Sequence, residues 1–220
     1  MQCIKDTIKN INIVIGCNIG CSYCYARMNN NRFHTIDDFN KPVFFENKLK
    51  MLNNKRHTAY LLTGQSDLSG WNEEWKDKVF SKMKENENTQ YIFLTKRPEN
   101  INLKETPDNG WFGVTVTSSK EKTRIDYLRN NIKAKHYHIT FEPMFDDVGK
   151  LDLNNISWIV IGTETGNRKG KISSKREWVF NIYNQAKEKN IPVFMKEDLL
   201  GILNEDEFVQ EFPKEFGEIK

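Results

Sequence analysis

The fold is decided by a stretch near the start of the chain, where an apolar run leads directly into three cysteines: Ile11-Asn12-Ile13-Val14-Ile15-Gly16-Cys17-Asn18-Ile19-Gly20-Cys21-Ser22-Tyr23-Cys24. The apolar run predicts a strand from Ile11 to Ile15 that ends at Gly16. The cysteine spacing, C-x3-C-x2-C, brings three thiols together on one loop. Three thiolates hold an iron–sulfur cluster that keeps one iron open to an outside ligand. The stretch therefore predicts a strand that ends at an open metal centre.

Beyond this stretch, short apolar runs alternate with longer amphipathic segments. The further runs predict strands at residues 58–63, 90–95, 111–116, 136–141, 156–161 and 191–195. The amphipathic segments predict helices at residues 36–53, 71–86, 117–132 and 174–190. Strands that alternate with helices form parallel sheets with the helices outside. A closed eight-fold barrel needs about 250 residues. We therefore predict an α/β fold, an open TIM-like (βα)6 partial barrel of mostly parallel strands with outer helices.

Length and composition set limits on organisation and location. The chain has 220 residues and no low-complexity linker, which predicts a single domain over residues 1–220. Its core would span about residues 10–196, and the tail, residues 197–220, would cap the barrel through Phe208, Val209 and Phe212.

The net charge of +3 is too weak to argue for nucleic acid by itself. No apolar run is long enough to span a bilayer, and the first residues lack a signal pattern. We therefore expect a cytoplasmic protein without a membrane partner. Clustered cysteines in a reducing compartment are more often metal ligands than disulfides. No role is predicted for Cys3.

Polar residues follow nearly every predicted strand at its carboxyl end. In parallel βα folds these ends meet at one edge of the sheet and form the site. The residues at the strand ends are Thr63-Gly64-Gln65-Ser66-Asp67, Thr95-Lys96-Arg97, Thr115-Val116-Thr117, Glu142, Gly162-Thr163-Glu164-Thr165-Gly166 and Lys196-Glu197-Asp198. The sequence thus predicts a site at this edge, next to the cysteine loop.

The cysteine spacing, the aromatic Tyr23 before the last cysteine and the position after a first strand resemble the signature of the radical S-adenosylmethionine (radical SAM) superfamily. Further motifs resemble its small members on phages and mobile elements. They are Tyr23-Cys24-Tyr25-Ala26, Ser66-Asp67-Leu68, Leu94-Thr95-Lys96-Arg97-Pro98, Trp111-Phe112-Gly113-Val114, Glu142-Pro143 and Trp158-Ile159-Val160-Ile161-Gly162. Together these motifs span roughly residues 10–200, most of the chain.

The resemblance implies a radical SAM enzyme with one [4Fe–4S] cluster, held by Cys17, Cys21 and Cys24. In that superfamily the reduced cluster cleaves S-adenosyl-L-methionine to methionine and a 5′-deoxyadenosyl radical, which abstracts hydrogen from a substrate. The cofactors carry the hard chemistry, so no catalytic side chain is assigned. The implied partners are an electron donor of flavodoxin or ferredoxin type, a small-molecule or nucleotide-like substrate, and a partner protein.

The resemblance also places S-adenosylmethionine among the strand ends. The implied contacts are Tyr23, Thr63, Gly64, Gln65, Ser66, Asp67, Lys96, Thr117, Glu142 and Glu164. Tyr23 would lie near the adenine, and Lys96 or Arg97 would pair with the carboxylate. The family often has a Gly-Gly-Glu-like turn that holds the methionine ammonium. Here Thr63-Gly64-Gln65 lacks the acid, and Ser66 or Asp67 would substitute for it.

Arg97, Arg168 and Lys196 are the candidate contacts to an anionic substrate. Arg168 begins the run Arg168-Lys169-Gly170-Lys171, which is equally a solvated surface loop. Glu142 and Glu164 are equally helix-start or salt-bridge residues.

Two other functions fit the same residues. The first is a zinc-stabilised nucleic-acid-binding module, with His34 as the fourth zinc ligand and basic stretches at residues 120–129 and 168–176. The second is a degenerate relative that binds the cluster but acts as a partner subunit.

Overall fold

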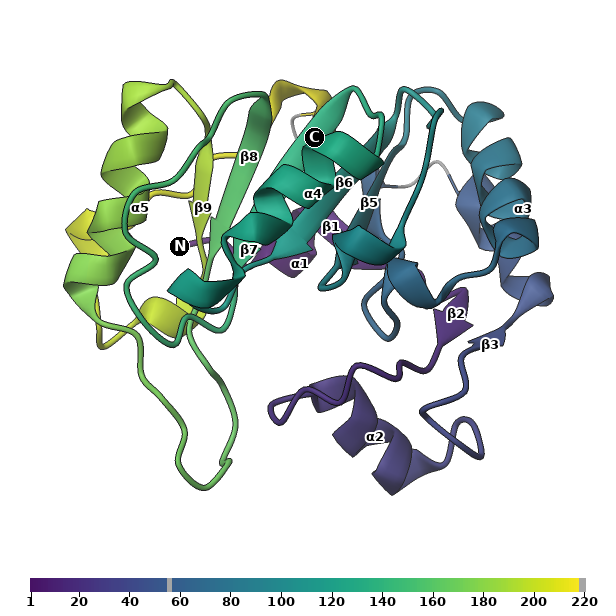
Figure 1. The fold of residues 1–220 in the computed structure, drawn as a ribbon, viewed down its shortest axis with the longest axis horizontal. Helices are drawn as coiled ribbons and strands as arrows, with labels where there is room; N and C mark the ends of the chain where they lie inside the picture. The colour runs from purple at the N-terminus through teal and green to yellow at the C-terminus, as the bar shows by residue number, and fades with distance from the viewer. Residues whose placement is uncertain (55–56, 218–220) are drawn as a thin grey trace.

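The centre of the protein is a parallel sheet curled into a half-barrel (Figure 1). The computed structural model describes residues 1–54 and 57–217. Within them, seven strands form the sheet in the order β1-β4-β5-β6-β7-β8-β9, and every neighbouring pair is parallel. Their bounds are β1 Ile8–Asn10, β4 Ala59–Leu61, β5 Gln90–Thr95, β6 Gly110–Thr115, β7 His136–Phe141, β8 Ile156–Ile161 and β9 Val193–Met195. The predicted open barrel is confirmed.

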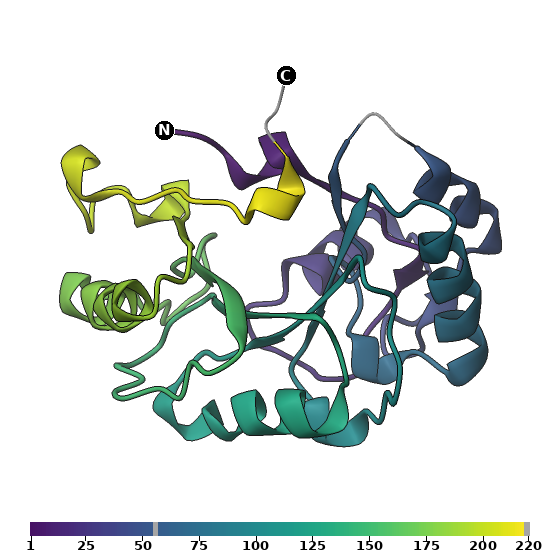
Figure 2. The same cartoon turned by 90° about the horizontal axis from the view of Figure 1, so that it is seen from above.

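Helices cover the outer face of the half-barrel (Figures 1 and 2). Their apolar faces pack on the outward side chains of the strands in the larger core cluster, as Val79 and Ile182 do. The helices are α1 Ile4–Thr7, α2 Tyr25–Phe33, α3 Glu73–Lys84, α4 Thr123–Asn131 and α5 Arg176–Glu188. Two helices are exceptions in position. α1 lies in the N-terminal segment on the open side of the sheet, where Ile4 packs against a cluster that contains Trp111 and Trp158 (Figure 2). α2 lies beyond the end of the sheet and follows the cysteine loop (Figure 1). The predicted helices at 71–86 and 174–190 correspond to α3 and α5.

The prediction of one strand from Ile11 to Ile15 is wrong. The first strand of the sheet is β1, and Val14–Ile15 forms β2, which pairs antiparallel with β3 (Val43–Phe44) in a separate small sheet. The chain turns between them, where the Ile13 N–H donates to the Ile11 carbonyl. β1 contains Lys9 and Asn10 and lies before the apolar run, so the apolar pattern points to Ile11–Ile15 and misses it.

The predicted helix over residues 36–53 is also wrong. The segment contains β3 and a 3-10 helix, Glu46–Asn53. Pro42 lies in its first half, and proline disfavours helical backbone at the residue before it. The predicted helix 117–132 begins later than expected, at Thr123, after a short 3-10 turn at Ser119–Glu121.

Aromatic side chains fill the inner face of the half-barrel towards the starts of its strands. Trp111, Trp158 and Phe194 from the sheet form a buried cluster with Phe216 from the tail. Figure 2 shows the tail and the N-terminal segment along the open side of the curled sheet. They join there through Gln210, which donates to the Gln2 carbonyl at 2.8 Å. The inner face is therefore closed at one end.

The tail makes two kinds of contact. Phe212 packs against the inner aromatic cluster, whereas Phe208 and Val209 pack against the larger cluster between the sheet and the helices. The tail also pairs with the sheet, through an antiparallel bridge between Gln210 and Phe194. Residues 218–220, the end of the predicted capping tail, lie outside the described residues.

A histidine lies across the middle of the inner face. The His138 ring crosses Gly113 of the neighbouring strand, and its Nε2 lies 3.0 Å from the Phe93 carbonyl of the strand beyond. The carbonyl only accepts, so Nε2 carries the proton. A Cβ on Gly113 would lie 2.3 Å from this nitrogen, so only glycine admits the ring.

Replacing Gly113 by alanine is expected to destabilise the protein. The new methyl group would overpack the inner face and displace the His138 imidazole from the Phe93 carbonyl. We expect a loss of about 1–3 kcal/mol in the free energy of unfolding. Urea denaturation of Gly113→Ala beside Gly70→Ala measures it, since a Cβ on Gly70 would meet nothing closer than 3.6 Å. Equal stability of the two variants would contradict the packing described above.

The stability should also depend on pH through His138. Burial lowers the pKa of His138 from 6.5 to about 4. The unfolded chain therefore takes up this proton first as the pH falls, and the stabilisation that is complete above pH 6.5 is lost towards pH 4. We expect about 3 kcal/mol for this residue. Denaturation of His138→Gln should show a shallower loss than wild type between pH 6.5 and pH 4. Parallel curves would refute the assignment.

Candidate functional site

The cysteine loop and the loop after β8 both extend from the carboxyl edge of the sheet (Figure 1). The cysteine loop joins this edge through Gly16, which forms a bridge with Ser66 after β4. A ring contact continues across the edge, since Tyr23 meets Phe145, which follows β7, edge-on at 5.5 Å between centroids. The structure thus brings the cysteines and the polar strand ends to one rim, as the sequence predicts.

The three cysteines of the loop are free thiols and each is partly buried. The Cys17 N–H donates to the Phe39 carbonyl at 2.6 Å, and the Arg27 guanidinium donates to the Cys17 carbonyl at 2.8 Å. Cys24 is the N-cap of α2, and its sulfur accepts from the Arg27 N–H at 3.4 Å. The positive end of a helix favours a thiolate. The backbone around the thiols is therefore fixed by hydrogen bonds.

Burial raises the pKa of the Cys17 thiol to about 11, although the Ile19 N–H acts to lower it. The Asp67 carboxylate and the Cys21 and Cys24 sulfurs also act to raise this pKa. Among the described residues, no three or more His, Cys, Asp or Glu side chains are arranged to hold a metal ion. Three free thiols are the right kind of donor for an iron–sulfur cluster, but this loop does not hold them in a metal-binding arrangement.

The fourth zinc ligand considered above lies away from these thiols. His34 is the C-cap of α2, whereas Cys24 is its N-cap. A nine-residue helix is about 13 Å long, so the His34 side chain and the thiols are at opposite ends. The geometry gives no support to a Cys3His zinc site.

Tyr23 lies over the rim with its ring between two loops. Burial raises the pKa of Tyr23, and the nearby Cys21 sulfur adds to this effect. The Lys96 ammonium lies 5.8 Å from the ring centroid and 3.4 Å from the Thr115 hydroxyl. Tyr23 and Lys96, which the resemblance assigns to the two ends of S-adenosylmethionine, therefore face each other at the rim.

Asp67 is occupied by the protein itself. Its carboxylate is buried and accepts from the Thr95 hydroxyl at 2.6 Å, the Lys96 N–H at 2.8 Å, and the N–H and hydroxyl of Ser69 at 3.0 and 2.7 Å. These bonds tie the end of β5 to the turn after β4. Asp67 therefore positions the rim and has little capacity left to substitute for the missing acid.

The hydroxyls of Thr63 and Ser66 and the backbone carbonyl of Gln65 also have partners. The Thr63 hydroxyl accepts from the Leu94 N–H at 2.7 Å, and the Ser66 hydroxyl accepts from the Trp71 indole at 3.0 Å. The Gln65 carbonyl accepts from the Gly16 N–H at 3.0 Å. The turn is therefore built into the rim by its own hydrogen bonds.

Gly64 is the residue of this turn that packs against the end of β1 and the segment after it. The Tyr25 hydroxyl donates to its carbonyl at 2.5 Å, which joins the start of α2 to the turn. A Cβ on Gly64 would lie 3.0 Å from Asn12 Oδ1 and 3.2 Å from Asn10 Nδ2. The sequence analysis does not single out these two residues, because Asn12 lies inside the predicted strand Ile11–Ile15 and Asn10 directly precedes it.

Thr117 binds the segment that follows it. Its N–H and hydroxyl both donate to one carboxylate oxygen of Glu121 at 2.7 Å. Glu121 also pairs with Arg124 at 2.8 Å. The hydroxyl that the resemblance assigns to the cosubstrate thus closes the turn before α4.

Glu142, Lys196 and Asp198 form a partly buried ion cluster at the rim. The Lys196 ammonium pairs with Glu142 and lies 3.3 Å from Asp198. Burial alone would lower the pKa of Lys196, but the two carboxylates outweigh it and raise the pKa. Gly162 makes room, since a Cβ there would meet all three side chains within 3.2 Å. One ammonium against two carboxylates leaves no free cation for an anionic substrate.

Glu164 anchors the basic loop after β8. Its carboxylate accepts from Arg168 Nε at 2.5 Å and Nη2 at 2.8 Å, and from the Ile172 N–H at 3.2 Å. The Arg168 guanidinium lowers the pKa of Glu164. Arg168 is therefore occupied, and Glu164 has the salt-bridge role that the sequence left open for it. Within the described residues, Arg97 has no ion pair, which separates it from Arg168 and Lys196.

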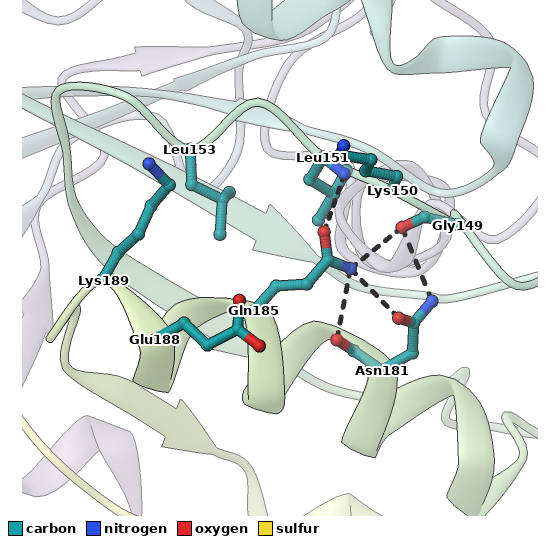
Figure 3. Close-up of a pocket in the computed structure, with 8 residues that line it drawn as sticks. All are labelled: Gly149, Lys150, Leu151, Leu153, Asn181, Gln185, Glu188 and Lys189. Carbon is teal, nitrogen blue, oxygen red and sulfur yellow. Dashed lines mark hydrogen bonds between the residues drawn. The ribbon is translucent and has the colours of Figure 1, made fainter.

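Two cavities differ in their relation to this rim. One, of about 390 Å³, lies between the loop after β7 and α5. Figure 3 shows Gln185 donating to the Asn181 side chain and the Gly149 carbonyl and accepting from the Leu151 N–H. The other, of about 470 Å³, is lined by Thr163, Glu164 and Asp198 at the rim. The rim cavity is the one that adjoins the predicted site.

Over residues 2–218 the chain matches a family described as Protein of unknown function (DUF5131). The chain belongs to this family. A segment of 98 residues is 35% identical to proteins named Lipase 1 from strains of Staphylococcus aureus. It covers 44% of this chain and 14% of each lipase, so the lipase name describes only those proteins.

No solved structure is significantly similar to this chain. No helix in residues 1–54 and 57–217 is both long enough and apolar enough to cross a membrane.

Replacing Glu164 by glutamine should loosen the basic loop. The amide cannot hold Arg168 with two charged bonds, so the loop opens more often. Limited trypsin digestion should cut the variant faster after Lys169 and Lys171, as mass spectrometry of the fragments measures. The control is Glu188→Gln on α5. If Glu164→Gln is cut at the wild-type rate, the anchor assignment is wrong.

Proposed function

We propose that the protein is a radical SAM enzyme with one [4Fe–4S] cluster. The observation that carries the proposal is the placement of three free thiols on one loop at the carboxyl edge of a parallel half-barrel. This loop contacts the polar rim through Tyr23 and Tyr25. Sites of parallel βα folds form at this edge.

Cys17, Cys21 and Cys24 would hold the cluster. When bound, such a cluster provides the single electron for cleavage of S-adenosylmethionine to methionine and a 5′-deoxyadenosyl radical. The residues of this chain would bind the cluster and S-adenosylmethionine, orient them, and exclude water from them. Arg27 holds the cysteine loop through the Cys17 carbonyl, and Asp67 fixes the end of β5 from which Lys96 extends.

S-adenosylmethionine would lie along the rim between the cysteine loop and the strand ends. Tyr23 offers a ring face for the adenine, and Lys96 offers an ammonium for the carboxylate. The cluster requires a reducing compartment, so we place the protein in the cytoplasm, with an electron donor of flavodoxin or ferredoxin type.

The substrate would enter at the rim, because aromatic side chains close the other end of the inner face. The proposal of an anionic or nucleotide-like substrate now rests on Arg97, since Lys196 and Arg168 already pair with carboxylates. The rim cavity beside Asp198 has the volume of a small-molecule site.

Anaerobic reconstitution with iron and sulfide tests the proposal. After reduction with S-adenosylmethionine present, we expect broad visible absorbance from the cluster and release of 5′-deoxyadenosine. The triple variant Cys17→Ala, Cys21→Ala, Cys24→Ala should lose both signals, because the thiols are the only ligands proposed. The variant Cys3→Ala is the matched control and should retain both.

Three results would contradict the proposal or its parts. One tightly bound zinc without iron would favour the zinc module. Both signals in the triple variant would overturn the ligand assignment. A cluster without cleavage would favour the degenerate partner subunit.

A further inference from the structure

The side-chain oxygen of Asn12 is buried and has no hydrogen-bond donor within residues 1–54 and 57–217. This atom, Oδ1, is one of three buried polar side-chain atoms without a hydrogen-bond partner among the described residues. A buried polar group of this kind destabilises the fold when it stays unpaired. The backbone of Asn12 is held in place, since its carbonyl accepts from the Lys48 ammonium at 3.0 Å. An unpaired acceptor on a fixed backbone points to a ligand that donates.

The surroundings of this atom belong to the candidate site. Asn12 follows β1 at the carboxyl edge, beside the turn after β4. A Cβ on Gly64 would lie 3.0 Å from its Oδ1, so the glycine keeps the space beside the amide open. The Tyr25 hydroxyl holds the Gly64 carbonyl and joins this place to the end of the cysteine loop. The acceptor therefore lies beside the turn that Tyr25, the residue after Cys24, binds.

The neighbouring acceptors are already used. The Asp67 carboxylate accepts four hydrogen bonds, and the hydroxyls of Thr63 and Ser66 each accept one. The sequence places no acid in Thr63-Gly64-Gln65. Asn12 is thus the side chain beside this turn with a buried acceptor to spare.

We propose that Asn12 binds the methionine ammonium of S-adenosylmethionine, in place of an acid on the turn after β4. An ammonium has three donors and no acceptor, which complements an unpaired amide oxygen. The amide comes from the segment that follows β1, so the contact is made by a residue outside the turn after β4. This inference rests on the proposed function, since it requires S-adenosylmethionine as the ligand.

Binding measurements on the reconstituted full chain test the inference without relying on activity. The variant Asn12→Leu keeps the size of the side chain and removes the acceptor. We expect S-adenosylmethionine to bind at least 10-fold more weakly, by anaerobic isothermal titration calorimetry. Methylthioadenosine lacks the amino-acid part, and its affinity should stay unchanged. The variant Asn12→Asp, which offers only acceptors, should bind S-adenosylmethionine at least as tightly as wild type.

A second readout comes from the protein without ligand. Because Asn12→Leu removes an unpaired buried acceptor, its melting temperature should rise above that of wild type. The matched control is Asn29→Leu, the same replacement at an exposed position of α2, which should bind S-adenosylmethionine as wild type does.

The outcomes separate this inference from the proposed function. If wild type binds S-adenosylmethionine and Asn12→Leu binds it equally well, the assignment of Asn12 is wrong and the proposed function stands. An equal loss for methylthioadenosine would also overturn the assignment, because it would show a general distortion. If wild type binds no S-adenosylmethionine, the proposed function itself fails.

Discussion

The half-barrel depends on how the inner face of an incomplete sheet is filled. A closed barrel covers its interior with its own strands, whereas this sheet has seven strands and an open side. Here the tail closes that side, and Phe216 packs fully buried against Trp111 and Trp158. The aromatic cluster fills the end where the strands begin, and His138 crosses the middle over Gly113. Only the carboxyl edge is left for polar groups.

The carboxyl edge is largely satisfied by its own hydrogen bonds and ion pairs. Asp67, Glu164 and the Glu142–Lys196 pair each bind protein groups from a neighbouring loop. Such bonds fix the loops around the rim before any ligand binds, as preorganised sites require. The groups that remain available are few, and this makes the unpaired Asn12 amide informative.

Much of the fold follows from periodicity alone. The strands at residues 90–95 and 136–141 are found as expected, because each is a buried apolar run of strand length. The region before residue 54 is different. The apolar run there contains only β2 of the small sheet, whereas the first strand of the large sheet, β1, lies before it. The segment around Pro42 forms β3 and a 3-10 helix instead of an α-helix. Local pattern does not say which partner a short strand finds, since pairing is set by distant residues.

The sequence by itself determined the parallel α/β class, the carboxyl edge as the place of the polar residues, and the gathering of three thiols on one loop. These follow from spacing along the chain, which periodicity and turn residues reveal. Only the tertiary structure decided the state of each group. Lys196 and Arg168 pair with carboxylates, and Asn12 is left with an unpaired acceptor, because loops distant in sequence meet at the rim. Whether a polar group is free depends on those neighbours, and spacing along the chain does not specify them.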